Sequence, residues 1–176
     1  MSSDIKNYIR SIKDFPKQGI MFRDITTILK NPMAMKQAEI ELFEFTVGKQ
    51  VDKVVGIESR GFIFGSILAR RLNVGFIPIR KPGKLPAEKV SQTYQLEYGT
   101  DTIEIHKDAI SKGDKVLIHD DLLATGGTAK AACELIEKLG GEVVQFSFLV
   151  ELTFLPGREK LSNYDVRSIV QYEDEN

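Results

Sequence analysis

One stretch of the chain combines residue types that suit different parts of a single ligand: Asp120-Asp-Leu-Leu-Ala-Thr-Gly-Gly-Thr128. Its glycine pair carries no Cβ, so successive backbone N–H groups can turn tightly and converge on one anion, and its two threonines add hydroxyl donors. The two adjacent carboxylates would repel a phosphate, but they accept hydrogen bonds from hydroxyl groups. The stretch therefore predicts a ligand with a phosphate monoester at one end and vicinal hydroxyls beside it, as in a ribose phosphate.

A strand and a helix have to position this loop. Residues 116–119 form a short apolar run after a Lys-Gly-Asp turn, which predicts a buried strand. Residues 129–139 are rich in helix formers and stop at Gly140-Gly141, so they predict a helix whose N-terminus favours an anion. The structural alternative is a plain turn in which Thr128 only caps the helix. No lysine follows the second glycine, so the stretch is not a Walker loop.

The other periodic segments predict an α/β fold. Apolar runs at 53–57, 75–79, 142–152 and 166–171 predict strands, while 32–47 and 62–71 predict helices and 156–161 a turn with a short helix. Helices between strands imply a parallel sheet covered on both faces, with ligands bound at the carboxyl ends of the strands. The turn at 58–61 and the loop at 120–128 both follow strands. Residues 4–12 predict an amphipathic helix, and residues 20–29 a loop passing into a short helical turn.

A long insertion separates the second predicted strand from the strand at 116–119. It begins with a basic loop, residues 80–86, and continues into an alternating segment, residues 93–105, with a Gly-Thr-Asp turn that predicts a β-hairpin. A long insertion in a compact domain is a candidate lid over a site. The alternative is a solvated connection whose charges only keep it soluble.

The composition indicates an ordinary folded protein of one domain. The 176 residues are 42% apolar and carry a net charge of −1, without the basic surplus of a protein that binds nucleic acid or an anionic membrane. One cysteine excludes an internal disulfide, and one cysteine with two histidines is too few for a zinc site of the usual ligands. Neither a signal peptide nor a membrane span is evident, so we expect a cytoplasmic protein.

Residues 120–128 closely resemble the 5-phosphoribosyl-1-pyrophosphate (PRPP) motif of the type I phosphoribosyltransferases, in the form found in the adenine phosphoribosyltransferase family. The resemblance covers nearly the whole chain, and its motifs occur in one order. Beyond the PRPP motif they are Phe15-Pro16 and residues 19–24, 58–62, 80–86, 96–99, 151–153 and 157–161.

The resemblance implies a type I phosphoribosyltransferase fold, an α/β fold with a central, mostly parallel sheet flanked by helices, as a single domain over residues 1–176. Residues 1–32 would form an N-terminal hood that binds the base, and residues 81–106 an inserted, flexible β-hairpin lid. The implied reaction is a pentosyl transfer of purine salvage, in which adenine and PRPP give AMP and pyrophosphate. Its cofactor would be Mg²⁺, held mainly by substrate oxygens and water rather than by protein side chains. A homodimer is also expected.

The same resemblance assigns the site residues. The 5-phosphate would be bound by Ala124, Thr125, Gly126, Gly127 and Thr128, and the ribose hydroxyls by Asp120 and Asp121. The pyrophosphate would meet Lys81, Lys84 and Arg60, which also counts as catalytic, and Tyr98 would join the PRPP site with the lid. Adenine would stack on Phe22, be read by the backbones of Met21 and Arg23, and be enclosed on its other side by Leu155.

Glu97, beside Tyr98 on the lid, is expected near the imidazole ring of the purine as a catalytic group. It would be either a general acid or base for the purine proton, or a carboxylate that only accepts a hydrogen bond. His106 and His119 are expected to be structural, and Cys133 to be buried.

Two rival functions remain open. A transferase for a 6-oxopurine such as xanthine would share the PRPP machinery and differ in a few base contacts, but residues 19–24 and the double-Asp motif favour adenine. The other rival is a non-catalytic PRPP sensor on the same fold. A regulator of nucleic acid should carry a DNA-binding module or a basic face, and this chain has neither the room nor the charge for one.

Overall fold

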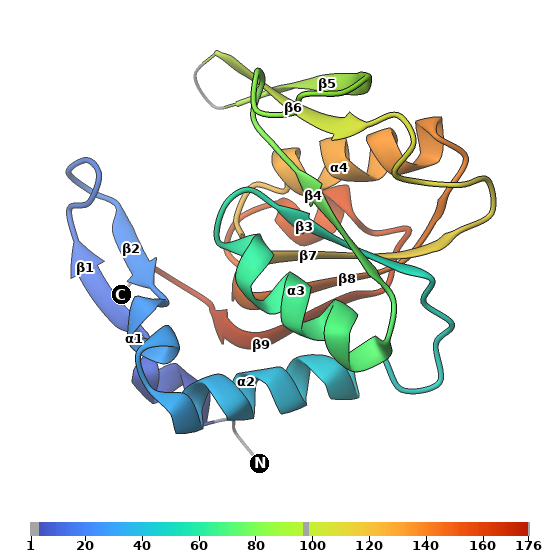
Figure 1. Cartoon of the computed structure of the whole chain (residues 1–176). Helices are drawn as coiled ribbons and strands as arrows, with labels where there is room; N and C mark the ends of the chain where they lie inside the picture. The colour runs from blue at the N-terminus through green and yellow to red at the C-terminus, as the bar shows by residue number, and fades with distance from the viewer. Residues whose placement is uncertain (1–3, 97–98, 176) are drawn as a thin grey trace.

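The computed structural model describes residues 4–96 and 99–175. A five-stranded sheet forms its centre, with the strand order β4-β3-β7-β8-β9 and parallel pairing throughout (Figure 1). Its strands are β3 (Lys53–Ile57), β4 (Gly75–Ile79), β7 (Lys115–Leu123), β8 (Glu142–Leu152) and β9 (Val166–Tyr172). All of these strands were predicted, as was the parallel sheet, but β7 continues to Leu123, so Asp120 and Asp121 lie in the strand and not in the predicted loop. Strand β4 lies at the edge of the sheet, where Pro78 removes no central hydrogen bond.

Helices cover both faces of this sheet. On one face lie α2 (Pro32–Glu44) and α3 (Gly61–Leu72), and on the other lies α4 (Gly127–Lys138), followed later in the chain by the short α5 (Gly157–Lys160) (Figure 1). The start of α2 was predicted correctly, because Asn31 Oδ1 accepts hydrogen bonds from the N–H groups of Met33 and Ala34 at 3.0 and 3.1 Å. No helix of the described residues is long and apolar enough to cross a membrane.

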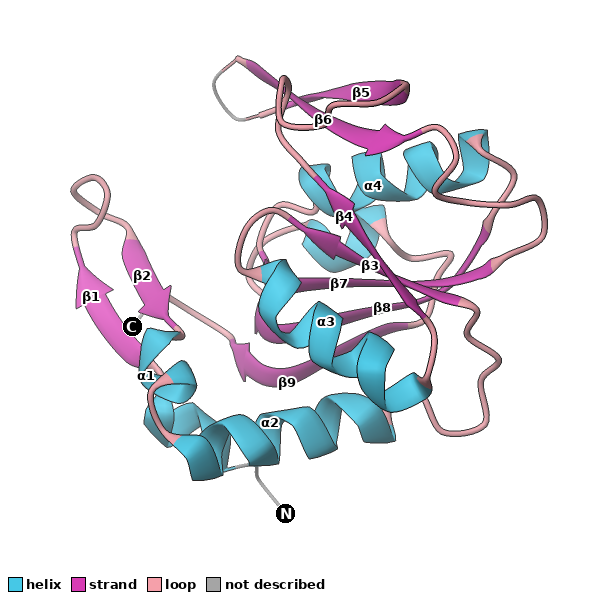
Figure 2. Ribbon diagram, in the orientation of Figure 1, coloured by secondary structure: helices cyan, strands magenta, loops and turns pink. Residues whose placement is uncertain are grey.

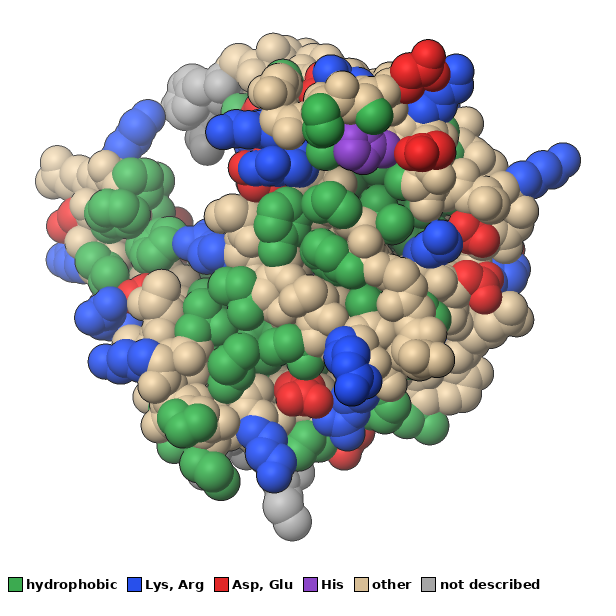
Figure 3. Space-filling view, viewed as in Figure 1, with side chains coloured by type: hydrophobic (Ala, Val, Ile, Leu, Met, Phe, Trp, Pro, Cys, Tyr) green, Lys and Arg blue, Asp and Glu red, His purple; other side chains and the backbone are tan. Residues whose placement is uncertain are grey.

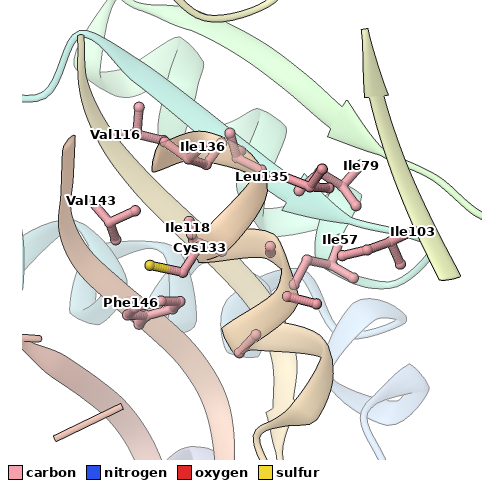
Figure 4. Packing of buried hydrophobic residues seen from close by; sticks show 14 of the residues in the cluster. Ile57, Ile79, Ile103, Val116, Ile118, Cys133, Leu135, Ile136, Val143 and Phe146 are labelled. Atoms are coloured by element: carbon pink, nitrogen blue, oxygen red, sulfur yellow. The ribbon is translucent and has the colours of Figure 1, made fainter. Parts of the chain in front are cut away.

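Two apolar cores follow from the alternation of side chains along the buried strands. Val116 and Ile118 of β7 pack with α4, whereas Leu117 between them packs with α2 and α3. Figure 4 shows the first core, in which the side chains of α4 meet those of β3, β7 and β8. Cys133 is fully buried there, as predicted. These cores hold the carboxyl ends of β3 and β7 beside one another.

The N-terminal segment corrects one prediction and part of another. The chain forms a 3₁₀ helix, η1 (Asp4–Tyr8), then the antiparallel strands β1 (Arg10–Lys13) and β2 (Met21–Asp24), and then α1 (Thr26–Leu29). The amphipathic helix predicted over 4–12 is therefore wrong beyond Tyr8, because residues 10–13 pair with β2 instead. The loop predicted from residue 20 is in fact β2, while the helical turn after it is confirmed. Figure 2 shows this small sheet standing apart from the central one.

The predicted hairpin is confirmed between β4 and β7, but its turn lies earlier than predicted, because Thr100 and Asp101 pair with β5 as the first residues of β6. It consists of β5 (Lys89–Gln95) and β6 (Thr100–His106), which pair in antiparallel register from Lys89 with His106 to Gln95 with Thr100. The end of β5 nearest the turn lies over the N-terminal end of α4, where the nearest neighbours of a Cβ on Gly127 would be Gln95 and the Tyr94 ring, both 3.3 Å away. The hairpin is therefore placed beside the predicted phosphate loop.

Candidate active site

A cavity of about 360 Å³ opens at the carboxyl ends of β3 and β7. Figure 3 shows the molecule hollowed between the N-terminal segment and the hairpin, with Lys and Arg side chains gathered at the rim. Five residues predicted to bind PRPP line the cavity together, although three separate segments supply them. The full lining is Ile57, Glu58, Ser59, Arg60, Lys81, Asp120, Asp121, Leu122 and Thr128.

The two adjacent carboxylates of β7 have different surroundings. Asp121 is 6% exposed and forms an ion pair with Arg60, whose Nε lies 2.6 Å from the carboxylate Oδ2. Among the described residues Asp120 forms no ion pair, and its Oδ1 accepts the backbone N–H of Asp121 at 2.9 Å. Burial, and then the charge of Asp121, raise the pKa of the Asp120 carboxyl well above its usual range. The cavity floor thus holds one paired carboxylate and one that resists ionisation, and both can hydrogen-bond to hydroxyl groups.

The predicted phosphate loop ends at the N-terminus of α4. Gly126 has φ of +77°, which favours glycine, and no side chain caps the first turn of the helix. Thr125 is exposed, and Ala124 and Gly127 are partly buried beside it. The first-turn N–H groups therefore have no side-chain acceptor, and the helix dipole adds a partial positive charge at this point. Of this loop, only Thr128 lines the cavity itself.

The basic loop is held to the cavity by a carboxylate that the sequence analysis did not single out. Glu58 Oε2 accepts the backbone N–H of Lys81 at 2.8 Å, and this bond lowers the pKa of Glu58. The side chain of Lys81 forms an ion pair with Asp101 of β6. Lys84 is exposed further along the loop and is not part of the cavity lining. The structure thus brings Lys81 to the site and leaves Lys84 outside the cavity.

A tyrosine of the hairpin joins the phosphate loop to the basic loop. The hydroxyl of Tyr94 accepts a hydrogen bond from Thr128 Oγ1 at 3.0 Å and donates one to Asp101 Oδ2 at 3.2 Å. Asp101 is also the partner of Lys81. No role was predicted for Tyr94 or Asp101, because only the pairing of β5 with β6 brings them together. Glu97 and Tyr98, the two residues of this insertion for which roles were predicted, lie outside the described residues.

The N-terminal sheet brings Phe22 toward the cavity. The guanidinium carbon of Arg60 lies 5.4 Å from the centre of the Phe22 ring, and Phe15 meets the same ring edge-on at 5.1 Å. Phe22 and Met21 are partly buried. Arg23 is 6% exposed, and its guanidinium carbon lies 3.8 Å from the centre of the Tyr172 ring. The Arg23 side chain is therefore packed into the protein, and only its backbone remains for a ligand.

Leu155 lies on the loop after β8, where its N–H donates to Leu152 O at 3.1 Å. The loop is tied to the end of β9, because the backbone N–H and the hydroxyl of Thr153 both donate to the carbonyl of Tyr172, at 2.9 and 3.0 Å. Tyr172 is thus in contact with both predicted sides of a base site: Arg23 on the hood and the loop that carries Leu155.

Comparison with known proteins agrees with this geometry. The phosphoribosyl transferase domain matches residues 24–175. The adenine phosphoribosyltransferase of Flavobacterium johnsoniae is 60% identical over 168 residues, which is 96% of this chain and 99% of that protein. The crystal structure of adenine phosphoribosyltransferase from Thermoanaerobacter pseudethanolicus has a TM-score of 0.95 at 53% identity, over 98% of this chain and all (100%) of that one. The Saccharomyces cerevisiae structure, complexed with an imino-altritol 1,6-bisphosphate and adenine, has a TM-score of 0.89 at 43% identity, over 96% and 97%.

The parallel sheet with helices on both faces, the inserted hairpin, and the two carboxylates of β7 followed by a glycine turn into an uncapped helix define a type I phosphoribosyltransferase. Within this class the chain belongs to the adenine phosphoribosyltransferase family. Both the fold class and the family predicted from the sequence are confirmed.

Proposed function

We propose that this enzyme transfers the 5-phosphoribosyl group of PRPP to adenine, giving AMP and pyrophosphate in purine salvage. The observation that carries the proposal is the shared cavity, in which Asp120 and Asp121 are brought together with Arg60, Lys81 and Thr128 of α4. A ribose with a phosphate at each end is complementary to this set, because its phosphates are anionic and its hydroxyls are hydrogen-bond donors. The 5-phosphate would bind residues 124–128, the ribose hydroxyls the two carboxylates, and the pyrophosphate the two cations.

The chemistry of the transfer fits these groups. Substitution at the anomeric carbon develops positive charge on the ribose and negative charge on the leaving pyrophosphate. Arg60 and Lys81 would stabilise the leaving group, and the carboxylates of β7 would hold the ribose in place. The end of β5 and the start of β6 contact cavity residues through Tyr94 and Asp101, so closure of the hairpin would exclude water that competes with the base.

The base would be read by the outer edge of β2. In the β1–β2 pair, alternate residues of β2 direct their backbone groups away from β1. Met21 and Arg23 are two residues apart, so their backbone groups point to the same side of the strand and could together hydrogen-bond the polar edge of a purine. The yeast structure similar to this chain was solved with adenine. The adenine bound in that structure supports adenine over a 6-oxopurine as the substrate of this enzyme.

A divalent cation fits the chemistry of this cavity. Glu58, Asp120 and Asp121 line it, but the described residues contain no group of three or more metal-ligating side chains close enough to hold an ion alone. A Mg²⁺ ion would therefore be shared with phosphate oxygens and water, and would neutralise charge on the pyrophosphate. The roles of Glu97 as a proton-transfer group and Tyr98 as a PRPP contact remain proposals on the lid.

We also propose a homodimer in the cytoplasm. Figure 3 shows apolar side chains gathered over α3 and β4. In the described part of the chain, strand β4 is an edge strand of the central sheet and pairs there only with β3. Partly buried Ile63 and Ile67 of α3, with Phe76 of β4, contribute to this face. A second copy of the chain would cover it. Sedimentation should then give twice the chain mass of 19.8 kDa, and a single-chain mass would refute the dimer.

A purine panel tests the proposed reaction. Purified protein, PRPP and Mg²⁺ are incubated with adenine, hypoxanthine, guanine or xanthine, and nucleotide formation is followed with and without a chelator. AMP from adenine alone, lost on chelation, is the expected result. Faster turnover of a 6-oxopurine would refute the base preference, and PRPP binding without any turnover would favour the sensor.

A further inference from the structure

The backbone of the phosphate loop is packed directly against α5. A Cβ on Gly157, the first residue of α5, would lie 2.3 Å from the carbonyl oxygen of Ala124 and 2.9 Å from Leu123. A Cβ on Gly126 would lie 2.9 Å from Gly157 in turn. Contacts of this kind leave no room for a side chain, so the backbone at Gly157 packs directly against residues 124–126 and limits the positions that their backbone can take.

An ion pair with a buried carboxylate holds Gly157 in that position. Its neighbour Arg158 donates two hydrogen bonds to Glu151, from Nε to Oε1 at 2.6 Å and from Nη2 to Oε2 at 2.5 Å. Glu151 is 1% exposed, and it also accepts the hydroxyl of Ser168 at 2.6 Å. A third donor of Arg158 reaches the carbonyl of Val166 at 3.1 Å. The bidentate geometry fixes the guanidinium and, with it, the start of α5.

Glu151 lies next to the phosphate loop across the sheet. It pairs with Leu123 in the parallel register of β7 and β8, and Leu123 is the last residue of β7 before the loop. A continuous series of contacts therefore runs from Leu123 to Glu151 by strand pairing, from Glu151 to Arg158 by the ion pair, and from the neighbouring Gly157 to Ala124 by backbone packing. Residues 151–153 and 157–161 were part of the sequence resemblance, which assigned them no contact with a substrate.

We propose that Gly157 and the Glu151–Arg158 ion pair are positioning residues that set the shape of residues 124–128 for the 5-phosphate of PRPP. The inference rests on the proposed function, because that function supplies the phosphate. Two features of this series of contacts support a role in the site beyond stability. First, Gly157 packs against the backbone of the phosphate loop itself. Second, the Glu151 carboxylate is buried near the carboxyl end of β8, at the same end of the sheet as the cavity.

The test compares Gly157→Ala with a matched control, Gly141→Ala. Neither glycine has positive φ, and a Cβ on Gly141 would also be too close to its neighbours, at 2.8 Å from Ile110 and Ile136. Gly141 follows the opposite end of α4, far along the helix from the loop. For each protein we would measure the Kd of ribose 5-phosphate by calorimetry, the KM values of PRPP and adenine, and the unfolding midpoint.

We expect Gly157→Ala to weaken ribose 5-phosphate binding and raise the KM of PRPP by about tenfold or more, with the KM of adenine changed by less than about twofold. Gly141→Ala should lower the unfolding midpoint but keep both phosphate-dependent constants near those of the wild type. Unchanged phosphate binding in Gly157→Ala would overturn the proposal. An equal loss in both variants would overturn it as well, because a general loss of stability would then explain the effect.

Arg158 provides a second route if Gly157→Ala does not fold, because its side chain is 47% exposed. Arg158→Ala should weaken ribose 5-phosphate binding, and Arg158→Lys, which keeps the charge but not the fork, should restore only part of it. Wild-type affinity in Arg158→Ala would refute the role of the ion pair. Ribose 5-phosphate binding requires no base, so it reports on positioning even if the wild-type enzyme transfers to no purine, which would instead refute the proposed reaction.

Discussion

His119 makes the stability of the enzyme depend on pH in a calculable way. The imidazole is fully buried in the middle of β7, its Nδ1 lies 2.9 Å from Ser147 Oγ, and its Nε2 has no hydrogen-bond partner among the described residues. Burial lowers the pKa of His119 from 6.5 to about 3. The folded protein therefore keeps this ring neutral at pH values at which an unfolded chain would protonate it.

The sign and size of the effect follow from linkage. Between pH 6.5 and about 3 the unfolded state binds one proton more than the folded state, so the free energy of unfolding falls as the pH falls. Above pH 6.5 both states are neutral and the full stability is present. Each pH unit within the window costs about 1.4 kcal/mol, so lowering the pH from 7 to 5 should cost about 2 kcal/mol through this residue.

Urea unfolding of wild type and His119→Val at pH 7 and pH 5 tests this expectation. The variant removes the titrating ring and leaves Ser147 without its partner, which costs about 1 kcal/mol at both pH values and cancels in the comparison. The wild type should lose about 2 kcal/mol more than the variant between the two pH values, a midpoint shift of about 1 M for a slope of about 2 kcal/mol per M. Equal losses would show that the folded state protonates His119 and would refute the reasoning.

Three further predictions concern the ligand. Glu97→Gln should lower kcat far more than PRPP affinity, and unchanged turnover would rule out proton transfer by Glu97. Asp121→Asn removes the partner of Arg60 at 2.6 Å and a hydroxyl acceptor, so it should weaken PRPP binding, an expectation that wild-type affinity in calorimetry would remove. Tyr94→Phe frees the Thr128 hydroxyl from its 3.0 Å bond and should tighten ribose 5-phosphate binding by about two- to tenfold; weaker binding would instead place the tyrosine hydroxyl in the closed complex.

The sheet and its helices could be predicted because their signals are local. The apolar run at 142–152 and the helix formers at 129–139 each define one element without reference to the rest of the chain. The N-terminal segment could not be predicted in the same way. Ile5 and Ile9 are buried at helical spacing, but Ile12 lies opposite Phe22 in a strand pair that depends on residues ten positions apart. A period cannot distinguish a short helix followed by a strand from one longer helix.

The site shows the same division between local and distant signals. The residues that approach the cavity from single loops, such as Arg60 and Thr128, were identified from spacing and resemblance. Tyr94 and Asp101 were missed as contacts because their connection to the loops exists only after the hairpin has folded over α4. Glu151 and Arg158 were noticed as a motif, but their bidentate contact, and hence a reason for the motif, required the structure.

The groups that would bind PRPP are paired with protein partners in this structure, so binding PRPP has a free-energy cost wherever one of these pairs must break. Arg60 is paired with Asp121, Lys81 with Asp101, and Thr128 with Tyr94. Lys81 and Asp101 are 41% and 30% exposed, and exposed ion pairs contribute only about 0 to 1 kcal/mol, so exchanging Asp101 for a pyrophosphate oxygen costs little. Asp121 is only 8% exposed at its side chain, so its bond to Arg60 would be expensive to abandon. We therefore expect Arg60 to keep Asp121 while its outer nitrogens meet pyrophosphate, and Lys81 and Thr128 to change partners as the hairpin moves.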